Sequence, residues 1–408
     1  MHPDFLAENI WRVHTKIGSH DLFEGIWPLP EGVHINAYVV KGSEKTALID
    51  FVCDWENGET DLTGQMQELG IKVADIDCLV INHMEPDHTG ALVDFRKKNR
   101  KAQIYCTKKA EPLVHAFLGI DDHIVTVKDG DSLDLGGRKL TFYETPNIHW
   151  PETMMTFDEQ TGVLFSCDAF GSFGIFDSLY EDELTEDERA RYFSEGERYY
   201  SNIVSTFSTF VQRGLAKLEK LPIKIVAPSH GVLWRQDIDR LLSWYKKLAQ
   251  YMNGPAEEEI TLVWSSMYGN TEALLDAVKD GIRSEGVKLH VLRVPQTHAS
   301  FVLEYAWRST GLIFGMPTYE YKMFPPMYHI LDILERSHVN NRKVMRFGSF
   351  GWSGGAQKQF EPFLESLKWD CVGTVEFQGA PTEEHKKKAF ETAVELARQV
   401  KAVFKPQE

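Results

Sequence analysis

Short runs of β-branched and aromatic residues, separated by polar turns, fill the chain from about residue 32 to residue 230. These runs lie at residues 35–42, 45–52, 77–83, 103–107, 123–145, 162–170 and 224–230. Helix-compatible stretches lie between them, so this half is expected to mix sheet and helix. Asp129-Gly130 and Gly136-Gly137 are typical hairpin dipeptides, and they favour antiparallel neighbours in part of the sheet.

The pattern changes in the second half, where apolar strands alternate with amphipathic helices. Strands are expected at residues 259–266, 288–294, 309–317 and 343–351. Helices are expected at residues 270–286, 300–308, 325–337 and 356–367. Strand and helix in regular alternation predict a doubly wound parallel sheet that is covered on both faces.

A linker separates these two patterns. Residues 254–259 read Gly-Pro-Ala-Glu-Glu-Glu, a combination that ends a helix and favours exposure. The predicted domains are therefore residues 1–253 and 254–408. A length of 408 residues agrees with two domains, because single cores stop growing well below this size.

Composition describes a globular protein, with 43% hydrophobic and 25% charged residues. No run is long and apolar enough to span a bilayer, and the N-terminus lacks the regions of a signal peptide. We therefore expect a cytoplasmic protein that does not bind membranes.

The net charge of −16 argues against nucleic acid as a partner, because phosphate neutralisation needs a stripe of lysine and arginine. The basic run at residues 97–101 is interpreted as a solvated helix end. The five cysteines are scattered and form no C-x-x-C pair, which argues against a disulfide framework and against a zinc or rubredoxin-type iron knot. They are Cys53, Cys78, Cys106, Cys167 and Cys371.

The first candidate site is a turn that follows the apolar run before residue 83. It holds His83, Glu85, Asp87 and His88, and a helix is expected to begin near Thr89. Imidazole and carboxylate together suit iron, manganese or zinc. Alternate positions point to different sides, so these four ligands are expected to straddle two ions rather than to surround one.

Two ions require more ligands, and the same half offers His149, Asp168 and His230 near the ends of other β-like runs. Each of the three has an ordinary structural role by itself, such as a helix N-cap for Asp168. The adjacent cluster makes a shared metal site the better interpretation. The histidines outside the pattern are assigned to structure or surface, and they are His34, His115 and His123.

The second candidate site is formed by three loops of the C-terminal half. The first loop runs from a strand into a helix and offers backbone N–H groups and hydroxyls to a phosphate, although a well-capped turn would look the same. It matches neither dinucleotide nor ATP motifs, which favours a monophosphate. Its residues are Ser265, Ser266, Met267, Tyr268, Gly269, Asn270 and Thr271.

Two further loops follow buried strands and carry aromatic side chains that could flank a planar ring. Core packing is the alternative role for Trp352, but the three loops together favour a flavin. The predicted ring-binding residues are Pro317, Thr318, Tyr319, Glu320, Ser349, Phe350, Gly351, Trp352, Ser353 and Gly354.

These motifs resemble the flavodiiron proteins, also called A-type flavoproteins, over nearly the whole chain. The resemblance implies an N-terminal metallo-β-lactamase-like αββα sandwich and a C-terminal flavodoxin-like sheet that binds FMN. It implies one iron held by His83, Glu85 and His149 and a second held by Asp87, His88 and His230, with Asp168 bridging them. The wider superfamily has histidine at the position of Glu85 and binds zinc, and a harder oxygen ligand shifts the preference toward iron.

The resemblance also implies reduction of O2 to water, of NO to N2O, or both, as a detoxifying oxidoreductase of the two-domain class. Electrons would come from rubredoxin, a reductase or a reduced deazaflavin. A head-to-tail homodimer, or a dimer of dimers, would bring one subunit's FMN to its partner's irons. One departure is Glu24, which stands where the family often has histidine. The alternatives are a zinc hydrolase, an electron carrier that uses only the second domain, and an interaction protein without chemistry.

Overall fold

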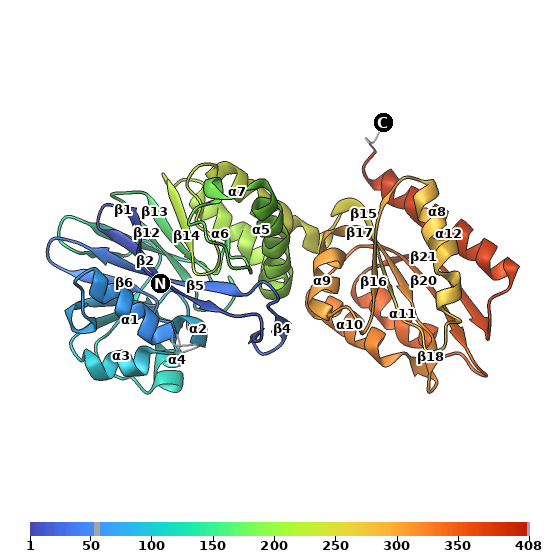
Figure 1. The fold of residues 1–408 in the computed structure, drawn as a ribbon, viewed down its shortest axis with the longest axis horizontal. Coiled ribbons are helices and arrows are strands. Elements are labelled where there is room, and N and C mark those ends of the chain that lie inside the picture. The colour runs from blue at the N-terminus through green and yellow to red at the C-terminus, as the bar shows by residue number, and fades with distance from the viewer. Residues whose placement is uncertain (53–57, 406–408) are drawn as a thin grey trace. The chain divides into compact units, whose positions relative to one another are not determined.

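The structure is a computed structural model that describes residues 1–52 and 58–405 (Figure 1). The chain divides into two compact units, Met1–Lys246 and Lys247–Glu408. The domain boundary expected after residue 253 stays a prediction; the division between the units falls inside helix α7 (Ile238–Gln250). Cys53 lies outside the described residues.

The first unit contains a seven-stranded sheet in the order β1-β2-β5-β6-β7-β8-β9. Neighbours are antiparallel from β1 to β6 and parallel from β6 to β9. The strands are β1 (Asp4–Ala7), β2 (Ile10–Ile17), β5 (Val33–Lys41), β6 (Thr46–Ile49), β7 (Cys78–Val80), β8 (Gln103–Thr107) and β9 (Ile124–Val127). A separate small hairpin is formed by β3 (Leu22–Phe23) and β4 (Trp27–Pro28).

A five-stranded sheet in the order β10-β11-β12-β13-β14 completes the strands of the first unit. Its first four strands are antiparallel, and β14 joins β13 in parallel. The strands are β10 (Ser132–Asp134), β11 (Lys139–Glu144), β12 (Met154–Asp158), β13 (Val163–Cys167) and β14 (Ile225–Pro228). The hairpin predicted at Gly136-Gly137 joins β10 to β11, whereas the Asp129-Gly130 turn leads from β9 in one sheet to β10 in the other.

One apolar core lies between the two sheets. Val40 and Val80 of the first sheet share a cluster with Phe142 and Phe165 of the second, and all four are buried. Helices cover the outer faces: Figure 1 shows α1 and α3 along one side of the paired sheets and α5, α6 and α7 along the other. Their bounds are α1 (Gly58–Glu68), α2 (Pro86–Thr89), α3 (Leu92–Lys98), α4 (Glu111–Leu113), α5 (Glu186–Tyr199) and α6 (Ser208–Leu218). This arrangement confirms the predicted αββα sandwich.

The second unit is a five-stranded parallel sheet in the order β16-β15-β17-β20-β21. Counted along this unit, the order is the flavodoxin-like one, in which the first strand lies between the second and the third. The strands are β15 (Glu257–Trp264), β16 (Lys288–Arg293), β17 (Ser309–Gly315), β20 (Lys343–Phe350) and β21 (Asp370–Gln378). The flavodoxin-like fold is confirmed.

Helices cover both faces of this sheet, with α8 and α12 on one side and α9, α10 and α11 on the other (Figure 1). β17 is buried along its whole length, as expected for a strand covered on both faces. The helices are α8 (Leu275–Ser284), α9 (Ala299–Arg308), α10 (Pro325–Arg336), α11 (Ala356–Ser366) and α12 (Glu383–Val403). A short hairpin of β18 (Thr318–Tyr319) and β19 (Lys322–Met323) follows β17.

Three parts of the fold differ from the sequence-based expectation. β1 and β2 lie before residue 32, where no strand was expected, and β21 and α12 lie beyond the last predicted helix. The helix expected near Thr89 begins earlier: α2 starts at Pro86, whose fixed φ suits the first helical position. Among the described residues, no helix has the length and apolar character needed to cross a membrane.

We expect Phe142→Ala to destabilise the first unit by about 3–5 kcal/mol, because it opens a cavity between the two sheets. Hydrogen–deuterium exchange with peptide resolution would show faster exchange in residues 1–246 and unchanged exchange in residues 247–405. Phe5→Ala is the matched control, because Phe5 is 63% exposed. Equally faster hydrogen exchange in both units would contradict the division into two units.

Candidate functional site

Four of the predicted ligands converge at one point of the first unit. His83, Glu85, His149 and Asp168 each bring one ligand atom to within 4.8 Å of the others. Nε2 of His149 lies 3.0 Å from Oε2 of Glu85, and Nε2 of His83 lies 3.3 Å from the same oxygen. Oδ2 of Asp168 lies 3.4 Å from His83 Nε2 and 3.6 Å from His149 Nε2.

The other three predicted ligands form a second group beside the first. Asp87, His88 and His230 are all buried, and one ligand atom from each lies within 4.8 Å of the others. The Asp168 oxygen that faces this second group is Oδ1. It lies 3.0 Å from His88 Nε2 and 3.2 Å from His230 Nε2. The carboxylate of Asp168 therefore directs one oxygen to each group.

Strand ends bring these distant residues together. β7 ends at Val80 and leads into the turn that carries the first four ligands, while Asp168 follows β13 directly. His230 lies just after β14, and the parallel pairing of β13 with β14 places Cys167 opposite Pro228. The two parallel strands thus deliver Asp168 and His230 to the same edge of the sheet.

Hydrogen bonds donated by Nδ1 orient three of the four imidazoles. Nδ1 of His83 lies 2.8 Å from Glu152 Oε1, and Nδ1 of His88 lies 3.1 Å from Asp50 Oδ2. Nδ1 of His230 donates to the carbonyl oxygen of His34 over 3.2 Å. Each bond leaves Nε2 facing the centre, which is the tautomer that a metal ligand needs.

Asp50 and Glu152 were missed by the sequence-based prediction. Asp50 directly follows β6, the neighbour of β7 in the sheet, so its position at a strand end was a signal. Glu152 lies three residues after His149 in sequence. Neither position could be assigned a histidine partner without the tertiary structure.

The carboxylates and imidazoles of the centre shift one another's pKa values. Burial alone would lower the pKa of His83, but the charge of Asp168 and the hydrogen bond with Glu152 outweigh it and raise that pKa to about 10. Burial would raise the pKa of Glu85, but hydrogen bonds with His149 and His83 lower it to about 2. Buried carboxylates thus require cations beside them, either protonated imidazoles or metal ions.

Unpaired buried atoms favour metal ions. Both side-chain oxygens of Asp87 and Nε2 of His230 lack a hydrogen-bond partner among the described residues, although Nε2 of His230 lies 3.3 Å from Asp87 Oδ2. Unpaired polar atoms are rare in protein interiors, and a bound ion is one of the causes that account for them. The donor set of imidazole and carboxylate fits a divalent transition metal.

Aromatic side chains surround the centre. The rings of Phe23 and His230 meet edge-on with their centroids 5.4 Å apart, and those of Trp150 and His83 do so at 5.1 Å. The hydroxyl of Tyr199 donates to Oδ1 of Asp168 over 3.3 Å. These side chains limit the access of water to the ligands.

Glu24 lies on the turn between β3 and β4, beside the first group. Nε1 of Trp27 donates to its Oε2 over 2.9 Å. The side chain reaches solvent, yet partial burial and then the charge of Glu85 raise the pKa of Glu24 to about 7. The position where the resemblance expected histidine therefore carries a carboxylate that titrates near neutral pH.

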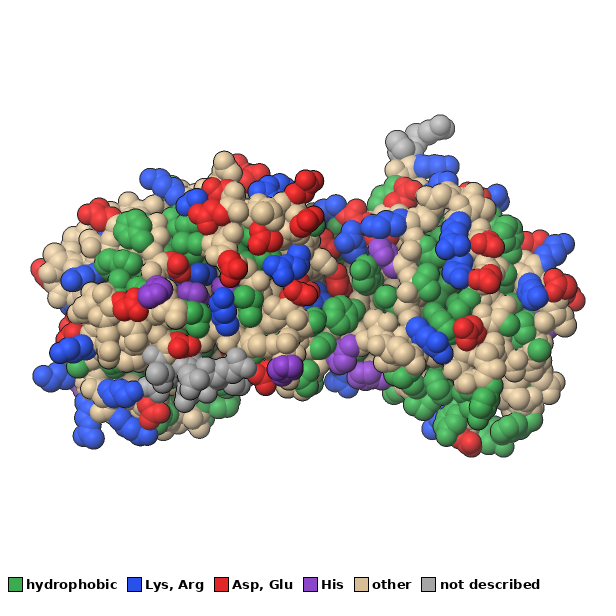
Figure 2. All heavy atoms as spheres, viewed as in Figure 1, with side chains coloured by type: hydrophobic (Ala, Val, Ile, Leu, Met, Phe, Trp, Pro, Cys, Tyr) green, Lys and Arg blue, Asp and Glu red, His purple; other side chains and the backbone are tan. Residues whose placement is uncertain are grey.

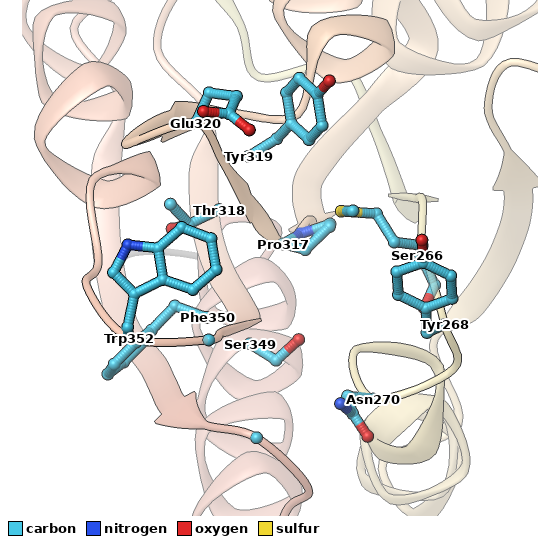
Figure 3. A pocket seen from close by; sticks show the side chains of 13 residues that line it. Ser266, Tyr268, Asn270, Pro317, Thr318, Tyr319, Glu320, Ser349, Phe350 and Trp352 are labelled. Carbon is cyan, nitrogen blue, oxygen red and sulfur yellow. The ribbon is translucent and has the colours of Figure 1, made fainter.

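The predicted flavin loops meet around a cavity of about 230 Å³ at the carboxyl end of the parallel sheet (Figure 3). Figure 3 shows Tyr268 and Trp352 on opposite sides of this cavity. Their side chains are 90% and 73% exposed, so neither belongs to the core. The lining residues are Ser266, Met267, Tyr268, Asn270, Pro317, Thr318, Tyr319, Glu320, Ser349, Phe350, Gly351, Trp352 and Gly379.

Five predicted flavin residues do not line this cavity. They are Ser265, Gly269, Thr271, Ser353 and Gly354. Thr271 Oγ1 lies 3.1 Å from Ser349 Oγ and joins two of the loops, and the amide of Gly269 donates to Ser266 Oγ over 3.0 Å. Gly379, which follows β21, lines the cavity but was missed, because no fourth loop was predicted.

Large apolar side chains gather on the surface around this cavity. Figure 2 shows hydrophobic side chains gathered where Figure 1 places β18. The exposed large side chains of these loops are Met267, Tyr268, Tyr319, Tyr321 and Trp352. Exposed aromatic rings beside a cavity are suited to flank a planar ligand.

A dinuclear ligand set in an αββα sandwich, followed by a flavodoxin-type sheet with a ring-binding cavity, defines a class of metal- and flavin-dependent oxidoreductases. Comparison with known proteins agrees. A family described as "ODP family beta lactamase" matches residues 33–231, and the flavodoxin family matches residues 262–392.

Relatives cover nearly the whole chain. The anaerobic nitric oxide reductase flavorubredoxin of Pectobacterium carotovorum is 33% identical over 403 residues, which cover 95% of this chain and 78% of the relative. The rubredoxin oxygen:oxidoreductase of Desulfovibrio gigas has a TM-score of 0.92 at 25% identity and covers 98% of this chain and 99% of its own. The flavodiiron protein of Giardia intestinalis has a TM-score of 0.91 at 25% identity, with 98% and 97% covered. The chain belongs to the flavodiiron protein family.

We expect Glu152→Leu to lower the affinity for Fe(II) about 10–100-fold, because His83 loses the acceptor that fixes its ring. The Fe(II) affinity of Glu152→Gln should lie between that of Glu152→Leu and that of the unchanged protein, since the amide oxygen can still accept the hydrogen bond from His83. Competition with a chromophoric chelator measures the affinity, and the exposed Glu159→Leu is the control. Unchanged affinity in Glu152→Leu would rule out this orienting role.

Proposed function

We propose that this chain reduces O2 to water, NO to N2O, or both, at a non-haem diiron centre that receives its electrons from FMN. The observation that carries the proposal is Asp168, whose two carboxylate oxygens face two separate groups of ligands. A hydrolase or an electron carrier does not need this centre and the flavin cavity together in one chain. The relatives in the comparison are oxidoreductases, which does not favour the hydrolase alternative.

We assign one iron to His83, Glu85 and His149 and the other to Asp87, His88 and His230, with Asp168 between them. When bound, the two irons and FMN supply up to four electrons, which match the reduction of O2 to two waters, whereas two NO molecules need only two. Glu85 gives the first position a hard oxygen ligand, and Glu152 and Asp50 hold His83 and His88 in the orientation for binding.

The chain's own residues also control the surroundings of the reacting gas. Phe23 and Trp150 exclude water from the imidazoles that they contact. Tyr199 holds a proton on its hydroxyl, hydrogen-bonded to Asp168 Oδ1, and Glu24 offers a carboxyl group with a pKa of about 7 at the edge.

For the flavin, we assign the phosphate to the loop of residues 265–271 and the ring to residues 317–320 and 349–354. The first loop leads into the helical turn Glu272–Leu274 and α8, whose N-terminus favours an anion. Trp352 and Tyr319 both line the cavity and would flank the ring. We add Gly379 to the ring-binding residues, because it lines the same cavity.

We further propose a cytoplasmic location, which agrees with the free thiols of Cys78, Cys106, Cys167 and Cys371. Rubredoxin is a candidate electron donor because a structural neighbour is named a rubredoxin oxygen:oxidoreductase. A reductase or a reduced deazaflavin are the other candidates. The names of the relatives include both NO and O2 as substrates, so both gases should be tested.

We expect Glu85→His to lower iron occupancy and to abolish gas reduction, because the first position then has the ligand set of zinc-binding relatives. Iron and zinc are measured in the purified protein, and consumption of each gas is followed after anaerobic reduction. FMN content should not change. Glu219→His, at the exposed end of α6, is the control. Full gas reduction by Glu85→His would refute the assignment of Glu85 as an iron ligand.

We propose a head-to-tail homodimer, or a dimer of dimers, because electron transfer requires the flavin to lie close to a metal centre. Specific gas-reducing activity should then fall as the protein is diluted below its dimer dissociation constant, while FMN remains bound. Analytical ultracentrifugation at the same concentrations links activity to assembly. A monomer that keeps full activity would contradict the dimer.

A further inference from the structure

A buried arginine lies next to the flavin cavity. Arg346 is on β20, three residues before Ser349, which lines the cavity, and its side chain is fully buried. A buried guanidinium is costly unless it has partners, so the groups around it decide its role.

The partners of Arg346 satisfy only part of its guanidinium. Nη1 donates to Glu376 Oε1 over 2.9 Å and reaches Gln357 Oε1 at 3.4 Å. Nε and Nη2 have no hydrogen-bond partner among the described residues. Burial therefore lowers the pKa of Arg346, although Glu376 partly opposes this effect. The side chain of Glu376 is 26% exposed, so the pair lies at the edge of the interior.

Both charged residues lie directly under the ring-binding loops. Arg346 and Glu376 are on adjacent strands, β20 and β21, whose ends supply Ser349 and Gly379 to the cavity. A Cβ atom added at Gly348 would lie 3.5 Å from Arg346 Nη2 and would clash with the carbonyl oxygen of Met316.

Glu376, the second residue of the pair, lies close to the loop that follows β20. A Cβ atom added at Gly354 would lie 3.4 Å from Glu376 Oε2. The charged groups of Arg346 and Glu376 thus lie close to the backbone at Gly348 and Gly354, respectively.

A second buried arginine near the same strand has different partners. Arg342 precedes β20, at the strand's opposite end, and its Nη2 donates to the carbonyl oxygens of Tyr251 and Trp307. No carboxylate forms an ion pair with Arg342 among the described residues, so it serves to join backbone segments. Arg346 instead has a carboxylate partner and lies toward the end of the strand that forms the cavity.

We propose that Arg346 and Glu376 set the reduction potential of the flavin bound in this cavity, with the guanidinium favouring the reduced form and the carboxylate moderating it. Reduction adds negative charge to a flavin ring unless every electron is matched by a proton. A buried cation stabilises that charge, and a nearby carboxylate opposes it. Few water molecules screen the buried Arg346, whereas the partly exposed Glu376 is screened more. This inference rests on the proposed binding of FMN.

Three variants of the full chain test the inference by redox titration of bound FMN. Arg346→Met should lower the midpoint potential, and Glu376→Gln should raise it. We expect each shift to reach about 30 mV for the two-electron couple, which is a ten-fold change in the ratio of reduced to oxidised flavin. The double variant should lie between the single variants, because both charges are then removed.

Lys343→Met is the matched control. Lys343 pairs with Asp370 at 2.5 Å on the same two strands, but at the ends away from the cavity. Its removal should leave the potential unchanged. FMN affinity is measured in parallel by fluorescence, because a merely structural role would weaken binding without moving the potentials of the two single variants in opposite directions.

Shifts of the same sign in Arg346→Met and Glu376→Gln, or no shift in either, would overturn the inference. If Arg346→Met does not fold, Glu376→Gln decides alone, since only the electrostatic role predicts a higher potential when that carboxylate is neutralised. An unaltered chain that takes up no FMN would instead refute the proposed function, which distinguishes the two failures.

Discussion

The carboxylate of Asp168 is the constraint on which the rest of the first unit depends. Its Oδ1 faces His88 and His230, and its Oδ2 faces His83 and His149. So much buried negative charge is unfavourable unless metal ions or protonated imidazoles lie beside the carboxylates. The two sheets therefore bring strand ends to one edge, where parallel pairing of β13 with β14 places Asp168 close to His230. The apolar core between the sheets holds these strand ends in place, so the ligands are already oriented for metal binding.

The ligand residues of this site were predictable from the sequence, whereas the carboxylates that orient them were not. The turn from His83 to His88 was informative by itself, because contiguous imidazoles and carboxylates are hard to bury without a bound partner. Asp50 and Glu152 were not predicted, because their role depends on tertiary contacts with Nδ1 atoms. The helix was expected only after the ligands, whereas α2 starts among them at Pro86, since proline favours the first helical position.

The fold was predictable where the hydrophobic period was regular. The alternation of strand and helix identified four strands of the parallel sheet, and each is present. β21 (Asp370–Gln378) was missed because Gly373, Thr374 and Glu376 interrupt its apolar residues, so its hydrophobic signal in the sequence is weak. The same strand leads to Gly379, and the prediction of the flavin cavity was incomplete for this reason. β1 and β2 were missed since they precede the region in which β-rich runs are dense.

The candidate sites of the two units share one structural feature. In each unit, strands end at one edge of a sheet, and charged side chains behind those ends are buried or partly buried. In the first unit these charges are ligands and the carboxylates that orient them. In the second unit Arg346 and Glu376 lie behind the loops that line the cavity. Burial makes each charge effective, because the dielectric screening of water is reduced.

Mössbauer spectroscopy of the oxidised chain, loaded with enriched iron, tests the central claim most directly. The account predicts two irons per chain that are spin-coupled through a bridge, and loss of this coupling in Asp168→Ala. A single isolated iron per chain, or a centre that retains zinc and excludes iron, would contradict it.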